Sequence, residues 1–129
     1  FKMISKVMVK KLKSKYGYEE TIEKLKDAIV NNGWSIPSEH NMEEKVGKKI
    51  YIIELCKQEY AKQILSDEKN YWVTAMMPCR VGICEEKDGV YLYSMNMKLL
   101  ANFLSGDVKK TFKKVAEEET EETPETSEV

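Results

Sequence analysis

The amino-acid sequence predicts an α+β fold: a single compact domain with a mostly antiparallel sheet packed against helices. Segments with the pattern of strands are interleaved with segments whose apolar residues recur at helical spacing. The stretch Lys87-Asp88-Gly89 separates two strand-like runs and is typical of a β-hairpin, which pairs its strands antiparallel. Six glycines and three prolines among 129 residues, 42% of which are hydrophobic, exclude a collagenous or low-complexity chain.

The first third of the chain is expected to form a strand, a helix and a second strand. Residues 3–12 have a β-branched centre that favours a strand, with a helix as the alternative. Apolar side chains recur every three or four residues over 18–29, which predicts a helix. Asn31-Asn32-Gly33 is expected to end it, because glycine adopts the left-handed conformation that closes a last turn. A short strand over 34–36 is expected to stop at Pro37.

The remaining elements follow in the same way. Residues 50–56 have the length and β-branching of a buried strand, and a helix is expected to begin near Lys57. Residues 71–77 predict another strand, which Pro78 interrupts. The hairpin strands are expected at 80–86 and 90–95, and two short helices at 99–104 and 108–116.

A disordered acidic tail is predicted after a domain of residues 1–116. Residues 117–129 contain seven glutamates and no lysine or arginine, too little apolar surface to offset the entropy of ordering. Without them, residues 1–116 carry an excess of positive charge, with lysines clustered at 10–15 and 109–114. No RNA-binding or helix-turn-helix motif accompanies these lysines, so a nucleic-acid partner is not expected.

Further classes of protein are disfavoured by what the sequence lacks. Every apolar run is interrupted by charge, so no membrane span is expected in this chain. The glycines stand singly, without a phosphate-binding loop. Three cysteines are too few for a disulfide scaffold and favour a reducing compartment, which predicts a cytoplasmic protein. The chain begins with Phe1, so an upstream segment of the native protein, such as a signal or an anchor, remains an alternative.

The cysteines are the first candidates for chemistry. In a strand over 80–86, alternation directs Cys79 and Cys84 to opposite faces, which argues against a shared metal and leaves Cys84 as a half-buried strand residue. Cys56 ends a strand before a helix, whose amino-terminal N–H groups stabilise a thiolate. Cys79 precedes Arg80, whose positive charge favours the same ionised form. Taken alone, these residue types favour packing as small hydrophobes over a functional role.

His40 and Glu54 are further candidates. His40 lies in a polar segment and is interpreted as an exposed loop histidine or a cap for residues 41–46. Glu54 interrupts an apolar strand, so it is expected to pair with a lysine or arginine or, less favoured, to line a cavity with a raised pKa.

The order of several short motifs resembles a known family. These motifs are Gly33-Trp34, Ile53-Glu54-Leu55-Cys56, Met77-Pro78-Cys79-Arg80, Asp88-Gly89 and Ser94-Met95-Asn96. Over about residues 1–118 the chain resembles the uncharacterised prokaryotic family called domain of unknown function 302. The resemblance implies a compact α+β domain that is often dimeric, and no established activity. It places Cys56 and Cys79 on the family's two cysteine motifs and Cys84 on neither, which favours a thiol site.

The resulting hypothesis is a small homodimeric binding module. Cys56 and Cys79 are expected to form a redox-active site or to ligate a transition metal or haem, with Arg80 and Glu54 tuning the thiols and His40 as an extra ligand. One alternative is a cysteine-dependent enzyme or sulfur carrier, in which Arg80 holds an anionic substrate. The other is a structural, partner-binding domain with inert thiols.

Overall fold

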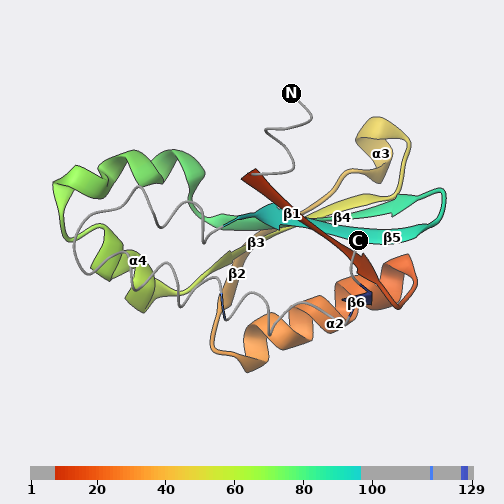
Figure 1. The fold of residues 1–129 in the computed structure, drawn as a ribbon, viewed down its shortest axis with the longest axis horizontal. Helices are drawn as coiled ribbons and strands as arrows, with labels where there is room; N and C mark the ends of the chain where they lie inside the picture. Colours follow the sequence, from red (N-terminus) through yellow and green to blue (C-terminus); the bar gives the residue numbers. More distant parts are fainter. Residues whose placement is uncertain (1–7, 97–116, 118–125, 128–129) are drawn as a thin grey trace.

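One antiparallel sheet organises the chain, with strand order β2-β3-β4-β5-β1-β6. The computed structural model describes residues 8–96, 117 and 126–127 (Figure 1). The elements are β1 (Val9–Ser14), α2 (Tyr18–Asn31), β2 (Ser35–Asn41), α3 (Glu43–Val46), β3 (Ile50–Cys56), α4 (Gln58–Ile64), the 3₁₀ helix η1 (Glu68–Met76), β4 (Cys79–Glu86), β5 (Gly89–Met95) and β6 (Thr126–Ser127). This architecture confirms the predicted α+β class.

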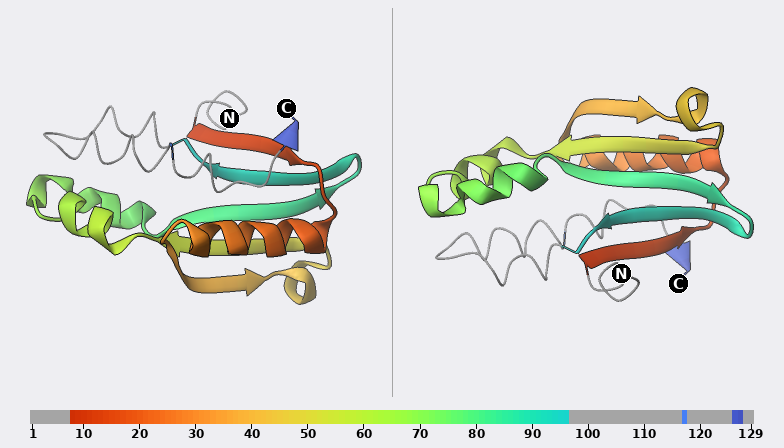
Figure 2. Two further views of the ribbon diagram at one scale, coloured as in Figure 1. Left: turned by 90° about the horizontal axis from the view of Figure 1, so that it is seen from below. Right: turned by 90° about the horizontal axis from the view of Figure 1, so that it is seen from above.

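Helix α2 covers one face of the sheet. The left view of Figure 2 shows it in front of the strands and the right view shows it behind them. Its buried residues Leu25 and Ile29 belong to one core cluster with Ile53, Ile83 and Leu92 of three successive strands. Strand residues two apart share a face, so every second residue of β3, β4 and β5 faces the side on which α2 lies. The other face of these strands is left for residues that the core does not use.

The carboxyl-terminal end of α2 lies where the sequence predicts it. The backbone N–H of Trp34 donates to the carbonyl of Ile29, and that of Gly33 donates to Val30. Gly33 has a φ of 82°, the left-handed conformation that this closing motif requires. The helix therefore ends where Asn31-Asn32-Gly33 predicts, and the chain turns directly into β2.

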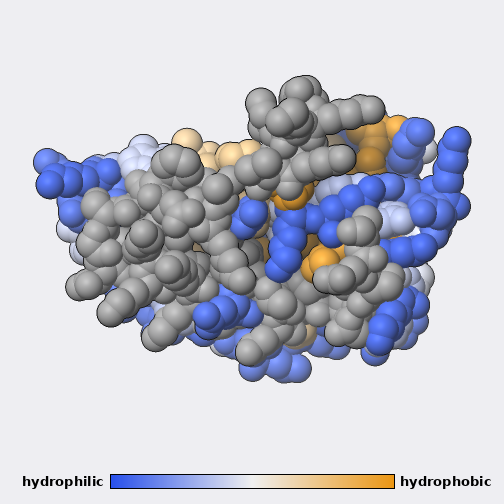
Figure 3. Space-filling model, in the orientation of Figure 1, coloured by the Kyte–Doolittle hydropathy of each residue, from blue (hydrophilic) through white to orange (hydrophobic). Residues whose placement is uncertain are grey.

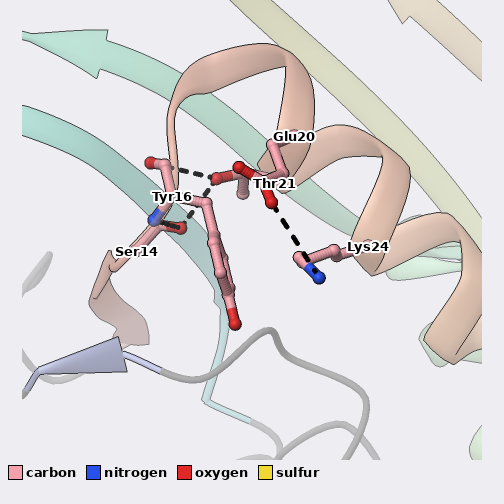
Figure 4. Close-up of polar contacts among 5 residues, drawn as sticks. All are labelled: Ser14, Tyr16, Glu20, Thr21 and Lys24. Atoms are coloured by element: carbon pink, nitrogen blue, oxygen red, sulfur yellow. Dashed lines mark hydrogen bonds and ion pairs between the residues drawn. The ribbon is translucent and has the colours of Figure 1, made fainter.

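A buried pair of hydroxyls joins β1 to α2 (Figure 4). The hydroxyls of Ser14 and Thr21 lie 2.7 Å apart, and Ser14 Oγ also accepts from the backbone N–H of Tyr16. Both side chains are buried, so each hydroxyl needs its partner inside the protein. On the surface beside them, Lys24 pairs with Glu20 at 4.0 Å and lies over the Tyr16 ring. The turn between β1 and α2 is thus held by side chains as well as by backbone.

Strand β2 extends further than the sequence predicts. The expectation that the strand stops at Pro37 is wrong, because β2 continues to Asn41. β2 is the edge of the sheet, and its register shifts between Ser35 and Ser38, where a residue without an N–H is tolerated. His40 therefore lies in a strand opposite Ile52, and the interpretation of it as a loop or capping residue is corrected.

The segment predicted as a strand over 71–77 lies instead in η1. The Asp67 carboxylate accepts from the backbone N–H of Lys69, and Asn70 Nδ2 donates to the carbonyl of Ile64. Asn70 and Val73 are the buried residues of η1, at the three-residue spacing of a 3₁₀ helix. These hydrogen bonds form at the start of η1 and outweigh the strand preference of the residues that follow them. Figures 1 and 2 show α4 and η1 extending beyond the end of the sheet where β3 finishes.

The strands at 50–56 and 80–95 are confirmed. β3 has the predicted bounds, and β4 and β5 form the hairpin around Asp88 and Gly89. The helices expected at 99–104 and 108–116, and most of the expected tail over 117–129, lie outside the described residues. Thr126 and Ser127 pair with Ser14 and Lys13 of β1 as β6.

We predict that Thr21→Val lowers the free energy of unfolding by about 1 kcal/mol, because Ser14 loses a buried hydrogen-bond partner while the side-chain shape is kept. The double variant Ser14→Ala/Thr21→Val should lose less than the sum of the two single changes. Urea unfolding measures both. Thr74→Val is the matched control, since the Thr74 hydroxyl bonds to Tyr71 on the surface. An equal loss at both threonines would contradict the prediction.

Candidate functional site

A row of polar side chains crosses β2, β3 and β4 on the face away from α2. Ser38, Glu54 and Arg80 are cross-strand neighbours, and His40 is the next residue of β2 on the same face. We call these four residues the polar face. In the right view of Figure 2 the strands carrying them lie in front of α2, so this face is turned toward the reader.

Glu54 is the centre of the polar face. Its Oε2 lies 3.2 Å from His40 Nε2 and 3.5 Å from Arg80 Nη2. The Glu54 side chain is only 13% exposed, whereas His40 and Arg80 are 45% and 64% exposed. The expectation that Glu54 pairs with a basic residue is therefore correct. The Glu54 carboxylate is therefore largely buried against the sheet, and the His40 and Arg80 side chains that contact it are exposed to solvent.

Each of the two partners of Glu54 is the one residue of its type in the sequence. His40 is the only histidine of the chain, and Arg80 is its only arginine against twenty lysines. Guanidinium differs from ammonium in presenting a planar fork of N–H donors that matches a carboxylate or phosphate. The one such fork in this protein lies beside its one imidazole.

The order Ser38, His40 and Glu54 suggests a hydrolase triad, but the contacts differ from one. Ser38 Oγ lies 3.3 Å from His40 Nε2, the same ring nitrogen that contacts Glu54. In a triad the acid holds one imidazole nitrogen while the other takes the proton of the nucleophile. Since both partners meet at Nε2, the arrangement lacks the relay through two ring nitrogens that defines a triad.

The register separates the two motif cysteines. Cys79 pairs with Leu55, and it packs against the core cluster on the α2 side. Cys56, one residue further along β3, alternates to the side of Glu54. The two thiols thus lie at neighbouring strand ends, and strand alternation directs them to opposite faces. The approach of their sulfurs that a shared site requires stays a prediction. Any redox or ligating role of either thiol stays a prediction.

Cys84 lies on the same side of the sheet as the polar face, opposite Ile50 and Tyr91. The predicted divergence of Cys79 and Cys84 therefore agrees with the register. Burial, and next the charge of Glu86, raise the pKa of the Cys84 thiol above its ordinary value. A thiol held in its neutral form is a poor nucleophile, which fits the expectation that Cys84 is a packing residue.

The described part of the chain shows neither a disulfide nor a ready metal cluster. No disulfide bond joins Cys56, Cys79 or Cys84. Among residues 8–96, 117 and 126–127, no three histidine, cysteine, aspartate or glutamate side chains are grouped to hold a metal ion. No helix within those residues combines the length and apolarity needed to cross a membrane.

A second polar group lies near the hairpin, where hydrophilic residues cover the right side of Figure 3. The Lys11 ammonium lies 4.4 Å from the centre of the Tyr91 ring and 3.6 Å from Glu86 Oε1. Tyr93 donates its hydroxyl to Glu86, and Tyr91 donates to Asp88. Burial and the Glu86 carboxylate raise the pKa of Tyr93, so its hydroxyl stays protonated. This lysine is thus engaged in holding β1 to the hairpin.

Fold and site define a single-sheet α+β domain with a polar cluster on one sheet face. Residues 10–123 match the family described as Domain of unknown function DUF302, and the chain belongs to that family. A crystal structure of an uncharacterised conserved protein of this family from Bacillus stearothermophilus is similar, with a TM-score of 0.78 at 17% sequence identity. The similarity covers 90% of this chain and 95% of the other. A comparison with curated proteins finds no match.

Two residues of this region were not identified from the sequence. Ser38 is separated from His40 by one residue, which places both on one face of a strand once the segment is known to be one. Gly82 lies between Arg80 and Cys84 in the interior of β4, where glycine is unfavourable. Two signals in the sequence could have identified them: Ser38 and His40 are two residues apart, and Gly82 is an isolated glycine inside an expected strand.

We predict that Cys84 is alkylated slowly at neutral pH, because burial and Glu86 disfavour its thiolate. Glu86→Gln removes the negative charge, so the pKa of Cys84 should fall and its alkylation should accelerate. Mass spectrometry of iodoacetamide-treated protein across a pH series measures the rate at each cysteine. Glu85→Gln is the matched control, since Glu85 lies on the opposite face of β4. Equal acceleration in both variants would contradict the assignment to Glu86.

Proposed function

We propose that this protein is a binding module for a small anionic ligand, with the polar face as its site. Arg80 and His40 contact the ligand, Glu54 holds both of them in place, and Ser38 orients the imidazole. The Glu54 contacts carry the proposal, because one shielded carboxylate oxygen organises two exposed nitrogen groups.

The burial of Glu54 supports this role. A carboxylate in a central strand loses hydration that it keeps on the surface, and a single pair seldom repays that loss. Alternation alone does not require a charge here, since the neighbouring Ile52 on the same face is apolar. Anchoring of a binding group explains why the charge is retained.

The choice of arginine supports an anionic ligand. Glu54 lies against one nitrogen of the guanidinium, and the 64% exposure of the side chain leaves donor groups facing solvent. A planar fork accepts a carboxylate through two parallel hydrogen bonds, which ammonium does not. A chain that uses lysine at its other basic positions gains this geometry at Arg80.

The cysteine hypothesis enters through Cys56. Its thiol is on the side of the polar face, two residues from Glu54, and lies at the border of the proposed site. In this proposal Cys56 is the thiol that takes part in redox chemistry or in ligation of a transition metal or haem. Cys79 packs against the core cluster. A cytoplasmic location stays part of the proposal, because three cysteines are too few for a disulfide scaffold.

We predict that acetate binds weakly to the polar face and that Arg80→Gln weakens this binding about tenfold, through loss of a charge-assisted hydrogen bond. Amide and imidazole NMR shifts followed during an acetate titration measure the affinity and locate the site. Arg80→Lys should bind with intermediate affinity, because it keeps the charge and loses the fork.

Lys87→Gln is the control for net charge, since Lys87 is exposed in the hairpin turn. It should bind acetate as the wild type does. Equal weakening in Lys87→Gln and Arg80→Gln would show non-specific attraction, and would overturn the proposed site.

A homodimer is proposed as the assembly. Among the described residues, β6 pairs with Lys13 and Ser14 alone on the outer edge of β1, and pairing of a second copy with the rest of that edge would extend the sheet. We predict a mass near twice the 15.0 kDa of the chain in light scattering. A monomer mass throughout a dilution series from high concentration would contradict this proposal.

A further inference from the structure

Gly82 occupies a place in the sheet where glycine has no structural cause. It lies inside β4, between β3 and β5, and a glycine in a strand interior weakens the strand. Strand glycines are usually explained by a bulge, by a positive φ or by close packing. Each of these explanations is testable in the structure.

None of the three applies to Gly82. The register of β4 with both neighbouring strands is regular through this residue. Its φ is not among the positive values, which belong to Gly33, Gly47 and Gly89 within the described residues. Within the described residues, a Cβ built on Gly82 meets no atom within 4 Å, so none of their side chains or backbone excludes a larger residue.

The bare backbone lies next to the polar face. Gly82 lies on the same sheet face as Arg80, which is two residues away, or about 6.6 Å along the strand. Its cross-strand neighbours are Ile52 in β3 and Tyr93 in β5. No atom of the described residues, the Tyr93 ring included, lies within 4 Å of the built Cβ. Among these residues, a strip of half-buried backbone without a side chain of its own therefore lies between an aliphatic and an aromatic residue, with a guanidinium at one end.

We propose that Gly82 is the floor of the ligand site and that the ligand is an aromatic carboxylate, whose flat ring rests on the backbone between Ile52 and Tyr93 while its carboxylate binds Arg80. Only a residue without a side chain lets a planar ring approach the backbone this closely. The charge of Arg80 matches a carboxylate, and the two flanking side chains match a ring. This inference rests on the proposed function and adds the class of ligand.

Benzoate and acetate separate the two proposals, because they share the carboxylate and differ in the ring. We expect the wild-type protein to bind benzoate about tenfold more tightly than acetate, from apolar area buried by the ring. Gly82→Val should reduce benzoate affinity to the level of acetate and should change acetate affinity much less, because acetate has no ring to rest on the backbone of Gly82. Gly82→Ala should fall between, and it provides a second variant with the smallest addition to an open space. Arg80→Gln should weaken both ligands.

The outcomes are distinguishable by NMR titration and light scattering. Binding of neither ligand to the wild type would overturn the proposed function together with this inference. Equal affinity for acetate and benzoate, or benzoate binding that is unchanged in both Gly82 variants, would overturn the inference and leave the anion site. Loss of a dimer mass in Gly82→Val, with benzoate binding unchanged, would assign the bare strip to a second copy of the chain and also overturn it.

Discussion

The two-residue alternation of β3 is the constraint on which core and site both depend. Ile53 and Leu55 are buried under α2, and the same backbone must direct Glu54 and Cys56 to the other face. A shift of register by one residue would place the carboxylate in the core and expose the isoleucine, so packing of the core holds the site in position. The stability of the α2 face thus determines the geometry on the face that carries the proposed site.

Elements with a strong pattern of their own were predictable, and elements defined by their neighbours were not. Residues 50–56 form a strand whose apolar run is readable in isolation, and α2 has both a buried stripe and an end signal. β2 is an edge strand with polar residues and Pro37, so its sequence has no strand pattern of its own. The hydrogen bonds to β3 define it as a strand. Residues 71–76 have strand-forming side chains, but the Asp67 and Asn70 hydrogen bonds decide for η1.

The candidate site divides in the same way. Glu54 was identifiable, because a charge inside an apolar strand requires a partner, and its pairing with Arg80 follows that expectation. The pairing of Cys56 with Cys79 depended on the register between β3 and β4, which no local pattern contains. Leu55 stands opposite Cys79, and that one-residue offset directs the two thiols to different faces. His40 enters the site only because the edge strand continues past Pro37.

The polar side of the central strands departs from what stability alone favours at two neighbouring positions. In β3, Glu54 carries a charge that is largely shielded from water. In β4, Gly82 has no side chain to pack. On the α2 side, both strands contribute aliphatic residues to the core. Replacing either by a β-branched residue would agree better with strand preference. Departures of this kind are expected where a sequence serves a site rather than the fold. Both positions are adjacent to the single arginine of the chain, which supports the proposal of one site. In that proposal the charge anchor and the bare surface together hold a ligand with an anionic end and a flat body.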